Sequence, residues 1–222
     1  LQSVSKEIIK VFNYFPGQEI YDVQLGSIGL HPWYINENYA DEIKALEKTF
    51  QQHQNLIAIG EIGLDKVTKV DFELQKEVFQ LQLDIAEKFN IPVIIHCVKA
   101  YSELLSIRKK KKNPTPWIFQ GYNSSADMAL KIAETGAFLS FGEFIFRENT
   151  KAFEAFKAVP VDHLFLETDE QMLYDIDEIY SRAAELKGMD ETHLKEQLYE
   201  NYNTIFNNWD SRLRGNDRHQ GV

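Results

Sequence analysis

Short apolar runs alternate with amphipathic helical patterns along most of this chain, and this alternation limits its fold more than any other feature. Such an order is typical of repeated βα units, which build a parallel sheet covered by helices. Two of the runs, Pro-Val-Ile-Ile and Leu-Phe-Leu, are continuously apolar, as strands buried on both faces are. The expected strands cover residues 23–30, 56–62, 92–96, 117–120, 137–141 and 163–167.

One helix stands out, over residues 71–90, because its apolar residues fall on a single stripe. The members of this stripe are Leu74, Val78, Leu81, Ile85 and Phe89. Pro92 blocks the continuation of the helix and begins the next strand. Further helices are expected over residues 124–136, 176–187 and 192–206.

The chain has 222 residues, of which 44% are hydrophobic, and this is enough to form one well-buried core. No linker, composition shift or internal repeat divides it, so we expect a single domain over residues 1–207. The remaining segment, 208–222, is polar and lacks periodicity, which predicts a frayed, disordered tail.

Composition excludes several classes of protein. A single cysteine, Cys97, excludes an intramolecular disulfide and a cysteine zinc finger, and it favours a reducing compartment, here the cytoplasm. No apolar run reaches the roughly 18 residues that span a membrane, so no membrane partner is expected. The net charge of −10 provides no broad surface for nucleic acid, so phosphate chemistry would need a local metal ion.

The basic run 108–112 is expected to be a solvated helix end. Nothing indicates an oligomeric state.

Polar residues follow the apolar runs at the points where parallel strands would end. They are His31, Glu61, His96, Gln120, Glu143 and Asp169. No glycine-rich phosphate loop follows any run, which disfavours an open doubly wound sheet. In a barrel, the C-terminal ends of the strands meet at one mouth, where active sites are built. We therefore expect an α/β fold, a TIM-like (β/α) barrel that is short or incomplete, with parallel strands and outer helices.

Glu61 and His96 end two of the apolar runs and are candidate metal ligands. A carboxylate at the end of a buried strand is costly unless it is paired or bound to a metal, and imidazole is the commonest side-chain ligand. The alternatives are structural, with Glu61 capping a loop and His96 satisfied by hydrogen bonds in the core. Asp65 is interpreted as a loop residue, and Cys97 as a small buried hydrophobe that points away from its neighbour.

Glu167 and Asp169 lie two residues apart and would share one face of a strand. Paired carboxylates can hold a cation, or one can orient a water molecule while the other supports a ligand. The structural alternative is that Glu167 pairs with a neighbouring basic group. His31 and Gln120 are further candidates for lining the mouth, whereas the Trp-Tyr pair close behind His31 could equally pack in the core.

Taken in order, these motifs resemble the TatD-type deoxyribonuclease family of metal-dependent hydrolases. The matching segments are Gly-Leu-His-Pro at 29–32, Gly-Glu-Ile-Gly-Leu-Asp at 60–65, a helix with Gln75, Phe79, Gln82 and Leu83, Pro-Val-Ile-Ile-His at 92–96, Leu-Glu-Thr-Asp at 166–169, and residues 201–206. The resemblance covers about residues 11–207. It implies a TIM-like barrel, a divalent cation (Mg²⁺, Mn²⁺ or Zn²⁺) and hydrolysis of DNA or a small phosphodiester. It implies Glu61, His96 and Asp169 as metal ligands, with Asp169 also the catalytic proton acceptor.

The chain departs from the family pattern at three places. The family's first strand carries a His-x-His pair of ligands, which is missing here and would lie just before Leu1. Gln120 stands where the family has a histidine, and Glu170-Gln171 replaces the usual Ser-Pro. Three of six expected ligands remain, so we expect one hard cation instead of a two-metal site, and poor nuclease activity.

Two other functions compete with a metal-dependent phosphodiesterase. The missing His-x-His pair and Gln120 favour a degenerate homologue that binds a ligand or partner without turnover. A metal-dependent hydrolase of a non-nucleic-acid ester or amide also fits, because a fold alone does not set the substrate. An upstream reading frame that encodes His-x-His would favour the active class.

Overall fold

The computed structural model describes residues 8–111, 114–168 and 173–216, and α7 beyond Phe206 by its backbone alone. Within these residues, seven parallel strands form one sheet in the order β1 to β7. The strands are β1 (Val11–Tyr14), β2 (Leu25–Ile28), β3 (Leu56–Asp65), β4 (Val93–Val98), β5 (Trp117–Phe119), β6 (Phe138–Phe141) and β7 (Leu164–Leu166). The helices are α1 (Tyr39–Gln52), α2 (Phe72–Phe89), α3 (Tyr101–Lys109), α4 (Ala126–Ala133), α5 (Lys151–Ala158), α6 (Ile176–Lys187) and α7 (Glu191–Asn216).

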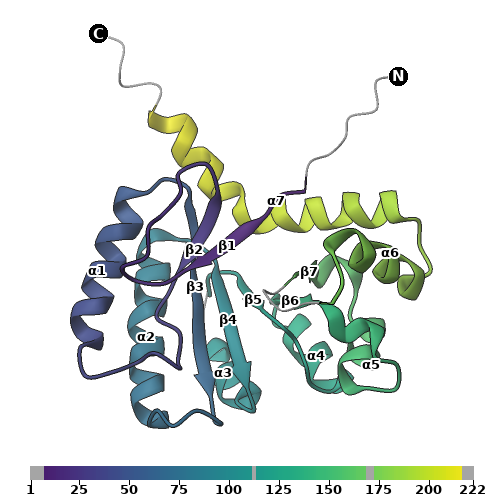
Figure 1. The fold of residues 1–222 in the computed structure, drawn as a ribbon, viewed down its shortest axis with the longest axis horizontal. Coiled ribbons are helices and arrows are strands. Elements are labelled where there is room, and N and C mark those ends of the chain that lie inside the picture. Colours follow the sequence, from purple (N-terminus) through teal and green to yellow (C-terminus); the bar gives the residue numbers. More distant parts are fainter. Residues whose placement is uncertain (1–7, 112–113, 169–172, 217–222) are drawn as a thin grey trace.

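The sheet curls into an open half-barrel with helices around its outer side (Figure 1). Each strand pairs with the next one along the chain, so β1 and β7 are the two edges. The amide of Asn13 in β1 donates to the side-chain oxygen of Gln120, which follows β5, over a distance of 2.9 Å. This bond between distant strands crosses the concave side of the sheet. The expected parallel α/β barrel, short of closure, is confirmed.

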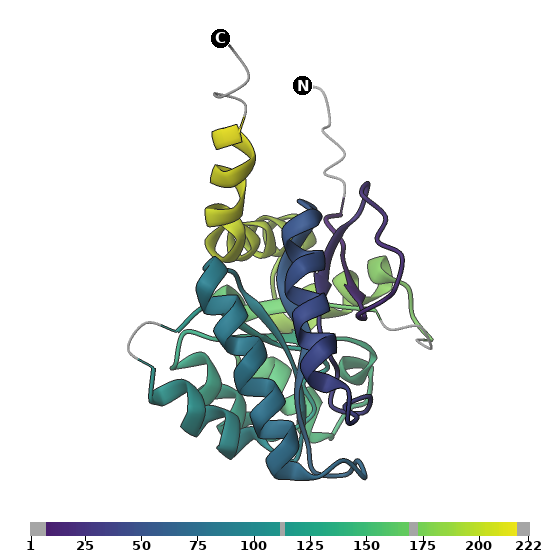
Figure 2. The ribbon, with the colours of Figure 1, turned by 90° about the vertical axis from the view of Figure 1, so that its left-hand side faces the viewer.

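Two apolar layers hold the sheet in place. On the outer face, α1 and α2 lie side by side (Figure 2), and the rings of Phe50 and Phe89 meet between them at 5.2 Å. A smaller apolar cluster is formed by Ile57, Ala58, Ile94, Ile118, Phe138, Ile205 and Phe206. Because the last two belong to α7, this cluster joins α7 to the strands. Within the described ranges, none of the helices combines the length and apolar character that crossing a bilayer requires.

Most of the predicted elements are present at nearly their predicted positions. The helix expected over 71–90 is α2, which begins at the N-cap Asp71 and ends at Asn90, whose φ of 51° is left-handed. The helix expected over 176–187 is α6. The six expected strands are β2 to β7. The pattern does not predict β1, because Phe12 is exposed and this edge strand is not a continuous apolar run.

The last helix extends beyond the predicted domain boundary at residue 207. Helical backbone continues to Asn216, so the segment 208–216 is helical where a frayed tail was expected. The rest of the expected tail, 217–222, lies outside the described residues.

Arg108 corrects the expectation that the basic run is a solvated helix end. Its side chain is buried, and it donates to the carbonyl oxygens of Thr115 and Thr135 at 3.0 and 3.1 Å. Burial lowers the pKa of Arg108 to about 10. The guanidinium therefore joins the end of α3 to the segments before β5 and after α4, whereas Lys109 and Lys110 are exposed as expected.

Arg108→Met is expected to lower the free energy of unfolding by about 2 kcal/mol, because a buried and a partly buried carbonyl group lose their donor. Lys109→Met is the matched control, since Lys109 is exposed and its replacement should change stability by less than about 0.5 kcal/mol. Urea unfolding followed by circular dichroism measures both. Equal effects of the two substitutions would contradict the structural role of Arg108.

Candidate metal centre

Three of the predicted residues meet near the C-terminal ends of neighbouring strands. His31 follows β2, Glu61 lies in β3 and His96 lies in β4. Each offers a potential ligand atom, and these atoms all lie within 4.8 Å of one another. The structure thus brings Glu61 and His96 together and adds His31, which the sequence places only at the mouth. Their role as metal ligands stays a prediction.

His96 is held between two carboxylates. Its Nδ1 lies 3.1 Å from Oε1 of Glu61, and its Nε2 lies 3.1 Å from Oδ2 of Asp65. Burial alone would lower the pKa of His96, but hydrogen bonding and attraction from both carboxylates outweigh it and raise the pKa above its ordinary value. A cation could replace the proton between His96 and Glu61 while Asp65 keeps the other ring nitrogen oriented.

Asp65 is therefore a site residue, and its interpretation as a loop residue was wrong. It is the last residue of β3 and its side chain is almost fully buried. Burial would raise its pKa, but hydrogen bonds from the Trp33 ring, the Val67 amide and His96 lower it overall. An ionised Asp65 can hold the imidazole of His96 in one orientation. The sequence signal was Asp65 itself, at the end of the motif that contains Glu61.

His31 is buried and neutral near pH 7. Burial and repulsion from His96 lower the pKa of His31 to about 4, against the opposing attraction of Glu61 and Asp65. The backbone N–H of Trp33 donates to Nδ1 of His31 at 3.2 Å. The hydrogen of the neutral ring consequently lies on Nε2. His31 can donate from Nε2, or it can ligate a cation through Nδ1 once the bond from Trp33 is released.

Two buried glutamines of α2 position the strand ends that carry these residues. Gln82 accepts from the backbone N–H of Leu30 at 2.7 Å and donates to its carbonyl oxygen at 3.1 Å. Gln75 makes the same pair of bonds with the backbone of Asp65, at 2.8 and 3.0 Å. Gln82 thus fixes the backbone beside His31, and Gln75 fixes the backbone of Asp65 itself. The two glutamines are seven residues apart and lie on one face of α2.

The glycines beside Glu61 allow the strands to approach closely. A Cβ atom on Gly63 would lie 1.9 Å from the carbonyl oxygen of His96. On Gly60 it would lie 2.6 Å from Cβ of Ile94. Both distances are far inside van der Waals contact, so β3 and β4 can align Glu61 with His96 only because these residues lack side chains.

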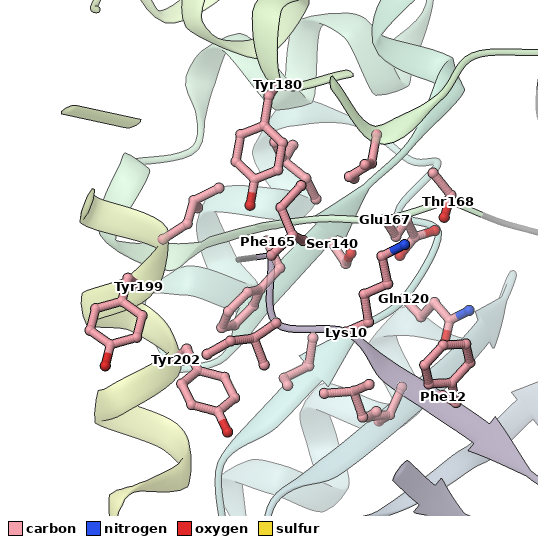
Figure 3. A pocket seen from close by; sticks show the side chains of 18 of the residues that line it. Lys10, Phe12, Gln120, Ser140, Phe165, Glu167, Thr168, Tyr180, Tyr199 and Tyr202 are labelled. Atoms are coloured by element: carbon pink, nitrogen blue, oxygen red, sulfur yellow. The ribbon is translucent and has the colours of Figure 1, made fainter. Parts of the chain in front are cut away.

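Gln120 and Glu167 lie on a neighbouring cavity of about 560 Å³ on the concave side of the sheet. In Figure 3 these two residues and Thr168 gather on one side of the cavity, while Tyr180, Tyr199 and Tyr202 lie on the other. Glu167 accepts from the backbone N–H of Gly121 at 3.1 Å. His31, Glu61 and His96 are not among the described residues that line this cavity.

Two other predicted residues remain to be placed. Asp169, predicted as a metal ligand and proton acceptor, lies outside the described residues. Cys97 is half-buried against the core, and burial raises its pKa to about 12, which agrees with its interpretation as a small hydrophobe.

The donor set suits a divalent cation. Glu61 contributes an anionic oxygen and His96 a ring nitrogen, with a second imidazole from His31 close by. Such mixed nitrogen and oxygen donors bind Zn²⁺ and Mn²⁺ well. Asp65, bonded to the far nitrogen of His96, completes the carboxylate–histidine pair common around bound metals.

Asp65→Asn is expected to weaken Mn²⁺ binding by about 10-fold, because the neutral amide no longer polarises and orients His96. Asp41→Asn is the control, since it removes the same charge from an exposed pair with Lys44 on α1. Isothermal calorimetry measures both affinities. If the two variants bind Mn²⁺ equally, Asp65 has no supporting role.

The fold and the site together define a TIM-barrel-like α/β protein with a candidate metal centre at the C-terminal ends of its strands. The model of the TatD related DNase family matches residues 16–207, and the chain belongs to that family. YabD of Bacillus subtilis, described as an uncharacterized metal-dependent hydrolase, is 33% identical over 68% of this chain and 60% of its own length. A similarly described protein of Haemophilus influenzae is 31% identical over 64% of this chain and 57% of its own. The chain thus spans roughly 60% of the length of these relatives.

Solved structures agree on the fold. YjjV of Escherichia coli, a TatD homologue, has a TM-score of 0.74 at 22% identity, over 84% of this chain and 78% of that chain. A TatD family hydrolase of Entamoeba histolytica has a TM-score of 0.68 at 17% identity, over 82% of this chain and 74% of that chain. At these identities the likeness concerns the fold alone.

Proposed function

We propose that this chain supplies the site of a metal-dependent hydrolase that acts on phosphodiester bonds, in DNA or in a smaller phosphodiester. The observation that carries the proposal is the set of ligand atoms on His31, Glu61 and His96, within 4.8 Å of one another at neighbouring strand ends. The matched family and its metal-dependent relatives support it.

Each residue of the site has a proposed task. A divalent cation (Mn²⁺, Zn²⁺ or Mg²⁺) on Glu61 and His96 would polarise a phosphoryl oxygen of the substrate. Asp65 holds the ring of His96, and neutral His31 can donate from Nε2 to a negatively charged oxygen. Asp169 is proposed as the acceptor of the proton from the attacking water. The single cysteine supports a reducing, cytoplasmic setting.

One observation favours slow turnover or a non-catalytic, metal-binding protein as the second candidate. The side-chain oxygen of Gln120, at the position of a family histidine, accepts from Asn13 at 2.9 Å. It is therefore engaged within the protein, which supports one cation in preference to two. A single cation lacks the clamp on attacking and leaving oxygens that two-metal sites provide.

The test compares hydrolysis of DNA, bis(p-nitrophenyl) phosphate and p-nitrophenyl acetate in the presence of Mn²⁺, Mg²⁺ or Zn²⁺. We expect slow, metal-dependent cleavage of the phosphodiesters, at least about 100-fold slower in His96→Ala. His53→Ala is the control, because His53 caps the C-terminal end of α1 and its ring lies 3.1 Å from the carboxylate of Asp22. Gln120→His should raise the rate.

Other outcomes separate the alternatives. Metal-dependent cleavage of the acetate alone would identify a carboxylic ester hydrolase. Metal binding without cleavage of any substrate would identify the non-catalytic homologue. Phosphodiester cleavage that is equal in His96→Ala and the unmodified chain would contradict the proposed site.

A further inference from the structure

Two aromatic side chains lie exposed beside the candidate metal centre. Trp33 and Tyr34 have exposed fractions of 56% and 55%, so the alternative that this pair packs in the core is wrong. The centroid of the Trp33 ring lies 5.0 Å from that of His31 and 5.8 Å from that of His96. Aromatic surface that touches both histidines is thus open to solvent.

The Trp33 ring is also held in place. Its Nε1 donates to Oδ2 of Asp65 at 2.6 Å, the same oxygen that faces His96. The ring of Tyr34 packs edge-on against Phe15 at 5.3 Å and lies 5.8 Å from His31. Side chains fixed before a ligand arrives lose little freedom on binding it. The contacts of both rings therefore hold their exposed faces in place before a ligand binds.

We propose that Trp33, supported by Tyr34, determines specificity by stacking an unpaired nucleobase of the substrate next to the scissile phosphodiester. This inference rests on the proposed function and concerns the recognition of the substrate. A phosphodiester at Glu61 and His96 would carry its nearest base within one nucleotide of the exposed Trp33 face, since this ring contacts His96. Bases in a single strand or at a frayed end offer the free face that such stacking requires.

The negative charge of the chain favours recognition of a nucleobase by aromatic stacking over recognition of the phosphate backbone. Its net charge is −10, and the carboxylates of Glu61 and Asp65 lie at the site itself. An extended phosphate backbone would be repelled by this surface in the absence of cations. Stacking depends on the base and not on the phosphate charge, so it can supply affinity where basic residues do not.

The experiment measures binding by calorimetry with Mn²⁺ present, using a four-nucleotide oligothymidylate and an abasic oligonucleotide of equal length and charge. We expect the base-bearing oligonucleotide to bind about 10-fold more tightly, in the range measured for stacking on one aromatic ring. Trp33→Leu should abolish this preference. Trp33→Phe should keep most of this preference, because it retains an aromatic ring. Both substitutions lose the hydrogen bond to Asp65, so a difference between them reports on the ring.

The control and the second readout make the outcomes distinct. Tyr21→Leu removes an equally exposed ring, 55% exposed, ahead of the N-terminal start of β2, and should leave the preference unchanged. Equal affinity of the unmodified chain for both oligonucleotides, including no detectable binding of either, overturns the proposal, as does a preference that survives Trp33→Leu. Base preference without any hydrolysis would overturn the proposed function and leave the role of Trp33 standing. If hydrolysis needs His96 but the preference for the base-bearing oligonucleotide survives Trp33→Leu, the proposed function stands and the role of Trp33 is overturned.

Discussion

Replacing Glu61 with glutamine is expected to weaken Mn²⁺ binding by at least about 100-fold. Partners that only orient a ligand contribute 10- to 100-fold to metal affinity, and Glu61 is proposed to contact the metal itself. The substitution keeps the size of the side chain but removes the negative oxygen that faces Nδ1 of His96 at 3.1 Å. Calorimetric titration with Mn²⁺ gives the affinity, and circular dichroism reports whether the fold is retained.

The matched control for Glu61→Gln is Glu47→Gln. Glu47 lies on α1 and pairs with Lys88 of α2, so Glu47→Gln removes the same single negative charge at a position outside the candidate site. Similar weakening in both variants would mean that overall charge governs binding. Retained affinity in Glu61→Gln would remove Glu61 from the ligand set.

Gly63→Ala is expected to lower the free energy of unfolding by at least about 3 kcal/mol, because the added methyl group has nowhere to go. Its Cβ would lie 1.9 Å from the carbonyl oxygen of His96, and backbone atoms of paired strands cannot rotate away as a flexible side chain can. The variant should also lose Mn²⁺ affinity, since any separation of β3 from β4 moves His96 away from Glu61.

Gly188→Ala separates this clash from the general effect of replacing glycine. Gly188 ends α6 with a φ of 62°, and a Cβ there would meet no atom within 4 Å. Only the left-handed backbone penalty of about 1 kcal/mol applies to it. Urea unfolding of both variants measures the difference. If Gly63→Ala is no more destabilising than Gly188→Ala, the close approach of β3 and β4 does not constrain the fold.

Local patterns predicted the elements that are marked by runs or stripes of apolar residues. The apolar stripe of α2 and the continuous apolar runs of β3 and β4 are properties of neighbouring residues, so the positions of these elements follow from the sequence alone, although Leu81 of the expected stripe is exposed. The same local reasoning does not indicate α5, which has only eight residues, or β1, an edge strand with exposed Phe12. Short and half-exposed segments take their structure from what they pack against.

The sequence did not predict contacts between residues that are far apart along the chain. Asp65 and His96 are 31 residues apart, and only the register of β3 with β4 brings their side chains to 3.1 Å. Arg108 finds its acceptor at Thr135, 27 residues along the chain, and is buried despite lying in a basic run. Nothing local distinguishes these side chains from solvated charges, because their desolvation is compensated by groups that folding supplies.

The sequence by itself determined the βα order, the family and the presence of Glu61, His31 and His96 in or just after neighbouring strands, since these follow from periodicity and short motifs. Tertiary structure alone decided that Asp65 orients His96 and that the Trp33 ring stays exposed over the site. The physical reason is that hydrogen bonds and burial depend on distances between segments. These distances are set only when the strands have paired and Gln75 and Gln82 of α2 have bonded to the backbone of Asp65 and Leu30.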